Sequence, residues 1–321
     1  MARGGIGPAD GADGADGADG ADGADGANVA VVSTGTGIPR PIGVSPALDQ
    51  VQNSSGVPQG WWHGYKWPPA DCAGLWKNAA PTKFPRNYWS FFHYSITVLG
   101  EFVQVTAPKW DGIALPAVPT GAAVDAELDE LAALIEYRAG VMAEALAQRD
   151  NLVAYWRGVL MFDAGSAPRT CDLIEIASIV GQFQAMHYKR KFNRPRASQY
   201  SPSLLPPINP PGHPSYPSGH ATEAHLMALC LAQVMPAAAS TNATPKPTPG
   251  HPNPPPISNS SPLARMAQRI ARNREVLGLH FPSDSAAGKK LAEESFNILM
   301  LCQSINDPND GIIALAKKEW A

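Results

Sequence analysis

Apolar residues at helical spacing run through much of the chain, and this pattern constrains its fold more than any other feature. They recur at intervals of three and four residues in segments 123–147 and 172–192, which forms the stripe that an α-helix buries against a core. None of these stretches shows the alternation of apolar and polar residues that is typical of a half-buried strand. Further segments with helical character are residues 88–103, 219–234, 262–277 and 284–302, the last with Ser283 or Asp284 as its N-cap. The sequence therefore predicts an all-α fold.

Segments without this period flank and interrupt the expected helices. Residues 11–25 are five Gly-Ala-Asp triplets without a large apolar side chain, which predicts a disordered low-complexity tail over residues 1–28. Residues 29–85 are rich in Pro, Gly and Trp, which favours a loop-rich segment that wraps the core. The other expected parts are a single helical domain at 86–305, a Pro-rich surface loop within it at 236–262, and a C-terminal tail at 306–321.

Charge and composition exclude several classes of protein. A net charge of -3 and a pI near 6.2 give no general attraction to nucleic acid or anionic lipid, so any anion site must be local. The N-terminus lacks the apolar region of a secretory signal, and the most apolar stretch, 224–239, is too short to cross a bilayer. We therefore predict a soluble protein with no nucleic-acid or membrane partner. Because no signal peptide or transmembrane segment is visible, the expected location is cytoplasmic or undetermined. A homo-oligomer is compatible with the sequence.

The four cysteines are far apart and form no CxxC pair. This spacing favours reduced, buried thiols over a zinc site or a disulfide framework.

A cluster of cations stands near the end of the expected helix 172–192. Its members are Lys189, Arg190, Lys191, Arg194 and Arg196. Such a density of positive charge is costly without an anion nearby. The alternative is a solvated helix end, where cations interact favourably with the helix dipole.

A second segment, Pro217-Ser218-Gly219-His220, directly precedes an apolar helix. It brings a hydroxyl, a glycine amide and an imidazole to a helix N-terminus, where unpaired N–H groups and the dipole favour an anion. The alternative is that Ser218 is a plain N-cap and that His213, His220 and His225 are ordinary polar residues. A serine hydrolase is not indicated, because the GxSxG pattern is absent.

A third segment runs from Asn273-Arg274 through His280 to Asp284. A carboxylate four residues beyond a histidine can accept the N–H of one ring nitrogen and leave the other facing a reacting atom. The alternative role of Asp284 is a helix N-cap. The absence of HExxH and ExxH pairs argues against the usual zinc and di-iron sites.

Together, the three segments resemble the signature of the superfamily that joins vanadium-dependent haloperoxidases, bacterial acid phosphatases and type 2 phosphatidic acid phosphatases. That signature is Lys-x6-Arg-Pro, then Pro-Ser-Gly-His, then Ser-Arg-x5-His-x3-Asp. The chain has Lys189-x6-Arg196, the intact Pro-Ser-Gly-His, and Arg274-x5-His280-x3-Asp284 in the same order. The resemblance spans roughly residues 172–303.

The chain departs from this signature at two positions. Ala197 replaces the proline of the first motif, and Asn273 replaces the serine of the third. Arg194, which is followed by proline, is a second candidate for the first arginine, but its spacing from Lys189 is x4. Arg196 is therefore the preferred assignment.

The resemblance implies a helical bundle of the haloperoxidase and acid phosphatase type. The sequence around the second motif looks most like that of soluble bacterial haloperoxidases. It implies vanadate as the cofactor, with vanadium bonded to His280 and with Asp284 fixing the tautomer of that histidine. The residues expected around the vanadate oxygens are Lys189, Arg196, Arg274, Ser218, Gly219 and His220, with Arg194 as a further candidate. Lys189 would also polarise hydrogen peroxide, which would oxidise a halide, most simply bromide, to hypohalous acid that then halogenates a small organic acceptor.

Two other functions stay open. A soluble acid phosphatase would use His280 as the nucleophile and His220 as the acid that protonates the leaving alkoxide. A catalytically silent helical module would keep only the anion site. The missing signal peptide and the large helical region before the first motif favour the haloperoxidase, and the intact His220, His280 and Asp284 favour an enzyme.

Overall fold

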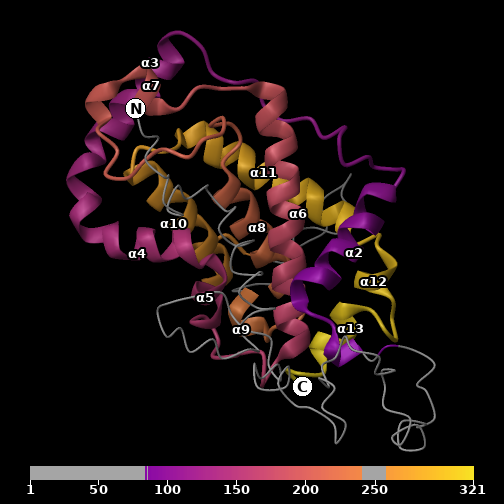
Figure 1. The fold of residues 1–321 in the computed structure, drawn as a ribbon. Helices are drawn as coiled ribbons and strands as arrows, with labels where there is room; N and C mark the ends of the chain where they lie inside the picture. Colours follow the sequence, from indigo (N-terminus) through magenta and orange to yellow (C-terminus); the bar gives the residue numbers. More distant parts are fainter. Residues whose placement is uncertain (1–83, 85, 241–257) are drawn as a thin grey trace, which may run out of the picture. The chain divides into compact units, whose positions relative to one another are not determined.

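The structure is a computed structural model that describes residue 84, residues 86–240 and residues 258–321. The expected tail at 1–28, nearly all of the expected wrapping segment at 29–85 and most of the Pro-rich loop at 236–262 lie outside the described residues. Within the described ranges every regular element is a helix (Figure 1), which confirms the all-α prediction. The chain from Ser90 to Ala321 belongs to one compact unit. The described part of this unit begins four residues later than the expected domain and includes both sides of the Pro-rich loop.

Helix α8 (Gly219–Leu231) is the central element of this unit. All of its residues are buried, and it contacts α6 (Pro168–Phe192), α10 (Pro262–Val276) and α11 (Pro282–Leu299) (Figure 1). A helix that is covered on every side needs apolar or small residues all round, which α8 has over most of its length. In the part of the chain that the structure describes, neither α8 nor any other helix is long and apolar enough to cross a bilayer.

The helices before α6 differ most from the prediction. Helix α2 (Phe91–Gln104) packs along α6. The single helix expected at 123–147 is instead α3 (Ala122–Ala133), the 3-10 turn η4 (Ile135–Tyr137) and α4 (Arg138–Asp150), followed by α5 (Leu152–Arg157). The break has a cause in packing: Leu131 of α3 lies in a cluster with Phe281, whereas Ala145 of α4 lies in another cluster with Leu279. The apolar residues of segment 123–147, which share one helical period in the sequence, thus pack against two different surfaces.

Two helix boundaries also differ. Helix α6 begins at Pro168 and α11 begins at Pro282, each with proline in the first turn, where its missing N–H costs nothing. The N-cap of α11 is Phe281, so the prediction that Ser283 or Asp284 occupies this position is wrong. Elements too short to show a period are η3 (Arg86–Tyr88), α7 (Ala197–Tyr200), η5 (Pro202–Leu204), α9 (Ala237–Ser240), α12 (Gln303–Asn306) and α13 (Ile312–Lys317).

The segment expected to be a C-terminal tail is part of the core. Ile312 and Ile313 of α13 are buried in the main apolar cluster. Beyond that helix, the carboxylate of Glu319 accepts hydrogen bonds from the backbone N–H groups of Arg169 and Thr170, at 2.7 and 2.9 Å. These N–H groups lie in the first turn of α6 and have no acceptor within their own helix. The expectation of a tail at 306–321 is therefore corrected: this segment packs on α6 and caps it.

Candidate active site

His280 and Asp284 form a fully buried pair at the start of α11. His280 Nδ1 lies 3.1 Å from Asp284 Oδ2, and both side chains have no exposed surface. The same carboxylate oxygen accepts from the backbone N–H of Phe281 at 3.0 Å and from the hydroxyl of Ser215. This histidine–carboxylate contact is the one that the four-residue spacing predicts, and Asp284 also satisfies a backbone donor at the helix start.

A neighbouring guanidinium indicates which ring nitrogen of His280 carries the proton. Arg196 Nη1 lies 3.1 Å from His280 Nε2. A guanidinium has only donors, so Nε2 must be the acceptor and must carry the lone pair. We assign the proton of the neutral ring to Nδ1 on this hydrogen-bond pattern. His280 therefore donates to Asp284 and directs its basic nitrogen toward Arg196.

Asp284 is held as a carboxylate. Burial alone would raise its pKa, but the hydrogen bond from His280, the positive charge of Arg194 and the hydrogen bond from Ser215 outweigh burial. The net effect lowers the pKa of Asp284 from 3.8 to about 2. The orienting group behind His280 is thus ionised at neutral pH.

Two cations of the first motif hold the loop that faces His280. Arg196 donates from Nε to the carbonyl of His213 at 3.0 Å and from Nη1 to the carbonyl of Leu279 at 2.9 Å. Lys189, in the last turn of α6, donates to the carbonyls of Pro214 and Ser215, at 2.8 and 3.1 Å. Both cations are almost fully buried. They connect the end of α6 to the segment that supplies the Ser215 hydroxyl.

Arg194 has a different environment from Arg196. It donates to Asp284 Oδ1 at 2.6 Å, to the Ser283 hydroxyl at 2.7 Å and to Glu127 Oε2 at 2.9 Å. Its positive charge is therefore shared between two carboxylates. Of the two arginines that the sequence offered for the first motif, Arg196 is the one in contact with His280.

The second motif lies where two helices begin. Ser218 is the N-cap of α8, its hydroxyl accepts from the N–H of Ala221, and its own N–H donates to the carbonyl of Asp284 at 3.0 Å. Gly219 and the fully buried His220 are the first two residues of that helix. The N-terminal ends of α8 and α11 are thus joined directly, and both dipoles favour negative charge nearby.

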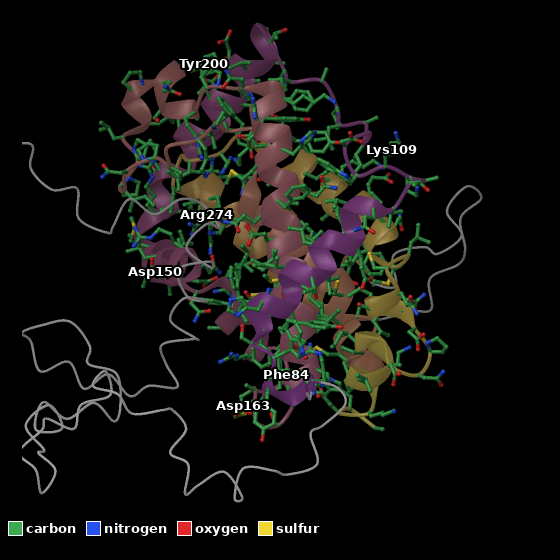
Figure 2. All side chains as sticks on the ribbon, turned by 45° about the vertical axis from the view of Figure 1, so that its right-hand side comes forward. Phe84, Lys109, Asp150, Asp163, Tyr200 and Arg274 are labelled. Atoms are coloured by element: carbon green, nitrogen blue, oxygen red, sulfur yellow. The ribbon has the colours of Figure 1, made fainter. Side chains whose placement is uncertain are left out.

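Arg274, at the end of α10, is fully buried and lies among packed helices (Figure 2). It donates from Nη2 to the carbonyl of Ala145 on α4. The neighbouring Asn273 donates to Gln148 Oε1 at 2.9 Å and to Glu144 Oε1 at 3.1 Å, both on α4. The third motif is therefore anchored to α4, a helix outside the resemblance, and the backbone N–H of Leu279 bonds to the Arg274 carbonyl at 3.0 Å.

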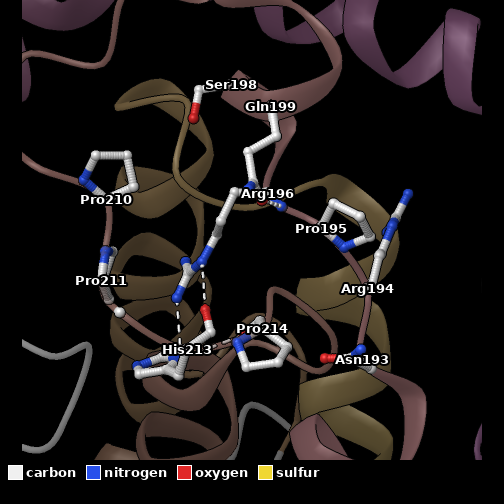
Figure 3. A pocket seen from close by; sticks show the side chains of 11 residues that line it. Asn193, Arg194, Pro195, Arg196, Ser198, Gln199, Pro210, Pro211, His213 and Pro214 are labelled. Carbon is white, nitrogen blue, oxygen red and sulfur yellow. Dashed lines mark hydrogen bonds between the residues drawn. The ribbon is translucent and has the colours of Figure 1, made fainter.

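A pocket of about 560 Å³ opens beside Arg196 (Figure 3). It is lined by residues 193–196, 198, 199 and 210–214. Among these described lining residues there are two arginines and one histidine but no carboxylate, so the pocket favours anions. Figure 3 shows the Arg196 guanidinium directed at His213, whose Nδ1 lies 3.0 Å from Nη2. The pocket is large enough for an organic molecule.

Three residues that this geometry brings into the site are not among those that the sequence predicts. The sequence indicates His213 only as an ordinary polar residue, yet it lines the pocket and accepts a hydrogen bond from Arg196. Ser215 binds Asp284, and Glu127 binds Arg194. A local signal existed only for His213 and Ser215, which stand just before the Pro-Ser-Gly-His motif; Glu127 is one of several acidic residues in a helical period and carries no such signal.

Among the described residues, no group of three or more His, Cys, Asp or Glu side chains is arranged to hold a metal ion. Neither a protein-family model nor a curated protein matches the chain.

Proposed function

We propose that the chain is a vanadate-dependent haloperoxidase that oxidises a halide with hydrogen peroxide. The observation that carries this proposal is the state of His280: its Nδ1–H is held by an ionised carboxylate, and its Nε2 lone pair is directed toward a guanidinium. An imidazole in this state is suited to bond a central atom, and donors beside it are suited to hold oxygens carried by that atom.

The residues present fit vanadate by their chemistry. His280 Nε2 would bond to vanadium, and the cations Lys189, Arg196 and Arg274 would balance the charge of the oxygens. Ser218 and the amide of Gly219 would add hydrogen bonds at the start of α8. When bound, vanadate supplies a Lewis-acidic centre that activates hydrogen peroxide toward halide without changing its own oxidation state.

The protein's own part in the reaction is to bind, orient and move protons. Asp284 keeps the proton of His280 on Nδ1, so that Nε2 stays a ligand atom. His220 supplies a second buried imidazole for proton transfer to a bound oxygen. The cationic pocket beside Arg196 would raise the local concentration of halide and admit the organic acceptor.

Orthovanadate titration into the purified protein tests this proposal. Bromination of an organic acceptor should require hydrogen peroxide and bromide, should rise with vanadate and should fall in excess phosphate, because both oxyanions compete for the same cations. Activity that is indifferent to vanadate and to phosphate would contradict the proposal.

An acid phosphatase is the second candidate, and the size of the pocket is the observation that favours it. A pocket of about 560 Å³ next to Arg196 can hold the organic group of a phosphate monoester. His280 would then attack phosphorus through Nε2, and His220 would protonate the leaving alkoxide. Hydrolysis of p-nitrophenyl phosphate with a phosphohistidine trapped at His280 would favour this function. Phosphate binding without either activity would favour the catalytically silent helical module instead.

A further inference from the structure

Glu127 of α3 contacts the site from outside the motif region. Its Oε2 accepts from Arg194 Nη2 at 2.9 Å, and its Oε1 accepts from the backbone N–H of Ser283 at 2.7 Å. The side chain of Arg194 is 1% exposed and that of Glu127 is 14% exposed, so solvent screens this ion pair little. One carboxylate thus binds both the arginine behind Asp284 and the first turn of α11.

Four side chains form a continuous path from α3 to His280. Glu127 binds Arg194, Arg194 Nη1 binds Asp284 Oδ1 at 2.6 Å, and Asp284 Oδ2 binds His280 Nδ1 at 3.1 Å. The guanidinium of Arg194 also lies 3.6 Å from the centre of the Phe281 ring, which limits its movement. Nη1 of Arg194 binds Asp284, whereas Nη2 binds Glu127. Arg194 therefore contacts only one oxygen of Asp284 and leaves the other for His280.

We propose that Glu127 is a positioning residue that, through Arg194 and Asp284, fixes His280 as the Nδ1–H tautomer. The reasoning is geometric. A guanidinium tends to bind a carboxylate with two parallel hydrogen bonds. Without the Glu127 carboxylate, Arg194 is able to turn both nitrogens toward Asp284 and to draw Oδ2 away from His280. The imidazole then loses the acceptor that selects its tautomer.

The effect on turnover rests on the proposed function, whereas the effect on the tautomer does not. The tautomer is a property of the protein without a bound anion. Side-chain nitrogen chemical shifts from NMR report it directly, and the His280→Gln variant assigns the signal. In the wild type we expect a protonated Nδ1 and an unprotonated Nε2 at neutral pH.

Glu127→Gln is the decisive variant, because it removes the charge and keeps the shape. We expect the Nε2–H form of His280 to appear, with Arg196 Nη1 then donating to the Leu279 carbonyl alone. We expect kcat to fall about tenfold, the lower end of the effect of losing a partner of this kind. Phosphate, used as the probe anion in calorimetry, should bind at least as tightly as in the wild type, since one negative charge has been removed. This split between binding and turnover separates positioning from a general loss of the site.

Glu101→Gln is the matched control. Glu101 of α2 also accepts from the first turn of another helix, through the backbone N–H of Ser304 at 3.0 Å and its hydroxyl. Its loss should lower thermal stability without changing the tautomer of His280. Arg194→Lys provides a second variant should Glu127→Gln fail to fold, because a lysine lacks the planar fork that spans two carboxylates.

The proposal is overturned if the His280 tautomer is unchanged in Glu127→Gln. The same holds for Arg194→Lys if that variant has to be used instead. Glu127 would then be only a cap of α11. A protein that lacks both peroxidase and phosphatase activity but shows the tautomer change refutes the proposed function and supports the positioning role. The two failures are therefore distinguishable.

Discussion

The backbone N–H of Ser218 donates to the backbone carbonyl of Asp284 at 3.0 Å, and this bond joins the first turns of α8 and α11. The approach depends on Gly288, where a Cβ would lie 2.7 Å from the Ser218 carbonyl oxygen and 2.9 Å from Ala221 Cβ. A backbone oxygen cannot move aside as a flexible side chain can. The geometry of the site is thus coupled to the absence of one methyl group.

Gly288→Ala should therefore destabilise the protein although alanine favours helices. We expect a loss of about 1–3 kcal/mol of unfolding free energy, as for other overpacked sites, measured by chemical denaturation. Gly100→Ala on α2 is the control, because a Cβ there meets no atom within 4 Å; it should be neutral or stabilising by up to about 1 kcal/mol. Equal effects of the two substitutions would refute this explanation.

Removing the imidazole should separate anion binding from turnover. His280→Ala keeps Lys189 and Arg196, so it should bind phosphate or vanadate weakly and lose nearly all turnover. Asp284→Ala leaves the ring without its acceptor and should cost roughly 10 to 100-fold in activity. Calorimetry and steady-state kinetics on the same preparations measure both quantities. Wild-type turnover by His280→Ala with added vanadate would contradict the assignment of His280.

The fold class could be predicted from the sequence because helical period is a local property of consecutive residues. The break between α3 and α4 could not, since it depends on Phe281 and Leu279, which are remote in sequence and form two separate packing surfaces. The C-terminal helix α13 was missed for a related reason: six residues are too few to show a period, and only the tertiary contact of Glu319 with α6 reveals its role.

The same distinction applies to the site. The His280–Asp284 contact follows from a spacing of four residues across a helix start. The contact of Ser215 with Asp284 spans 69 residues and that of Glu127 with Ser283 spans 156. No local pattern encodes such contacts: the position of Ser215 beside the second motif marks it only as a candidate, and its contact with Asp284 follows from the packing of the helices.

A buried histidine away from the site predicts sensitivity to acid. His225 of α8 is 9% exposed, and burial, followed by the charge of Lys289, lowers its pKa from 6.5 to about 3. The unfolded chain binds a proton as the pH falls through 6.5, whereas folded His225 stays neutral down to about pH 3. The free energy of unfolding should therefore decrease as the pH falls through this window, by on the order of a few kcal/mol in total.

His225→Gln should reduce this dependence on pH, as measured by urea unfolding at neutral pH and at about pH 4.5, where the His225 contribution is already partly lost. His93→Gln, at an exposed position on α2, serves as the control. An unchanged slope in His225→Gln would show that other groups cause the acid sensitivity.

Asn273 stands where the motif that the chain resembles has serine, and its contacts predict a structural cost for its removal. Its amide donates to Glu144 and Gln148 of α4. Asn273→Ala leaves these acceptors with fewer donors in a mostly buried network and should lower stability by about 1–3 kcal/mol. Asn273→Ser, with a shorter side chain, should not restore both contacts. Thermal unfolding of the two variants checks this, with Gln268→Ala on the exposed face of α10 as the reference.

Helix α8 has no solvent-facing side, and this has a consequence for attempts to cut or transplant the site. A fragment limited to residues 172–303 would contain every motif residue but would omit α3, α4 and α13. It would thereby lose Glu127, one of the two carboxylate partners of Arg194, together with the acceptors of Asn273 and Arg274 and the cap on α6. We therefore expect a working site to require the whole helical assembly from α2 to α13, not the motif segment alone.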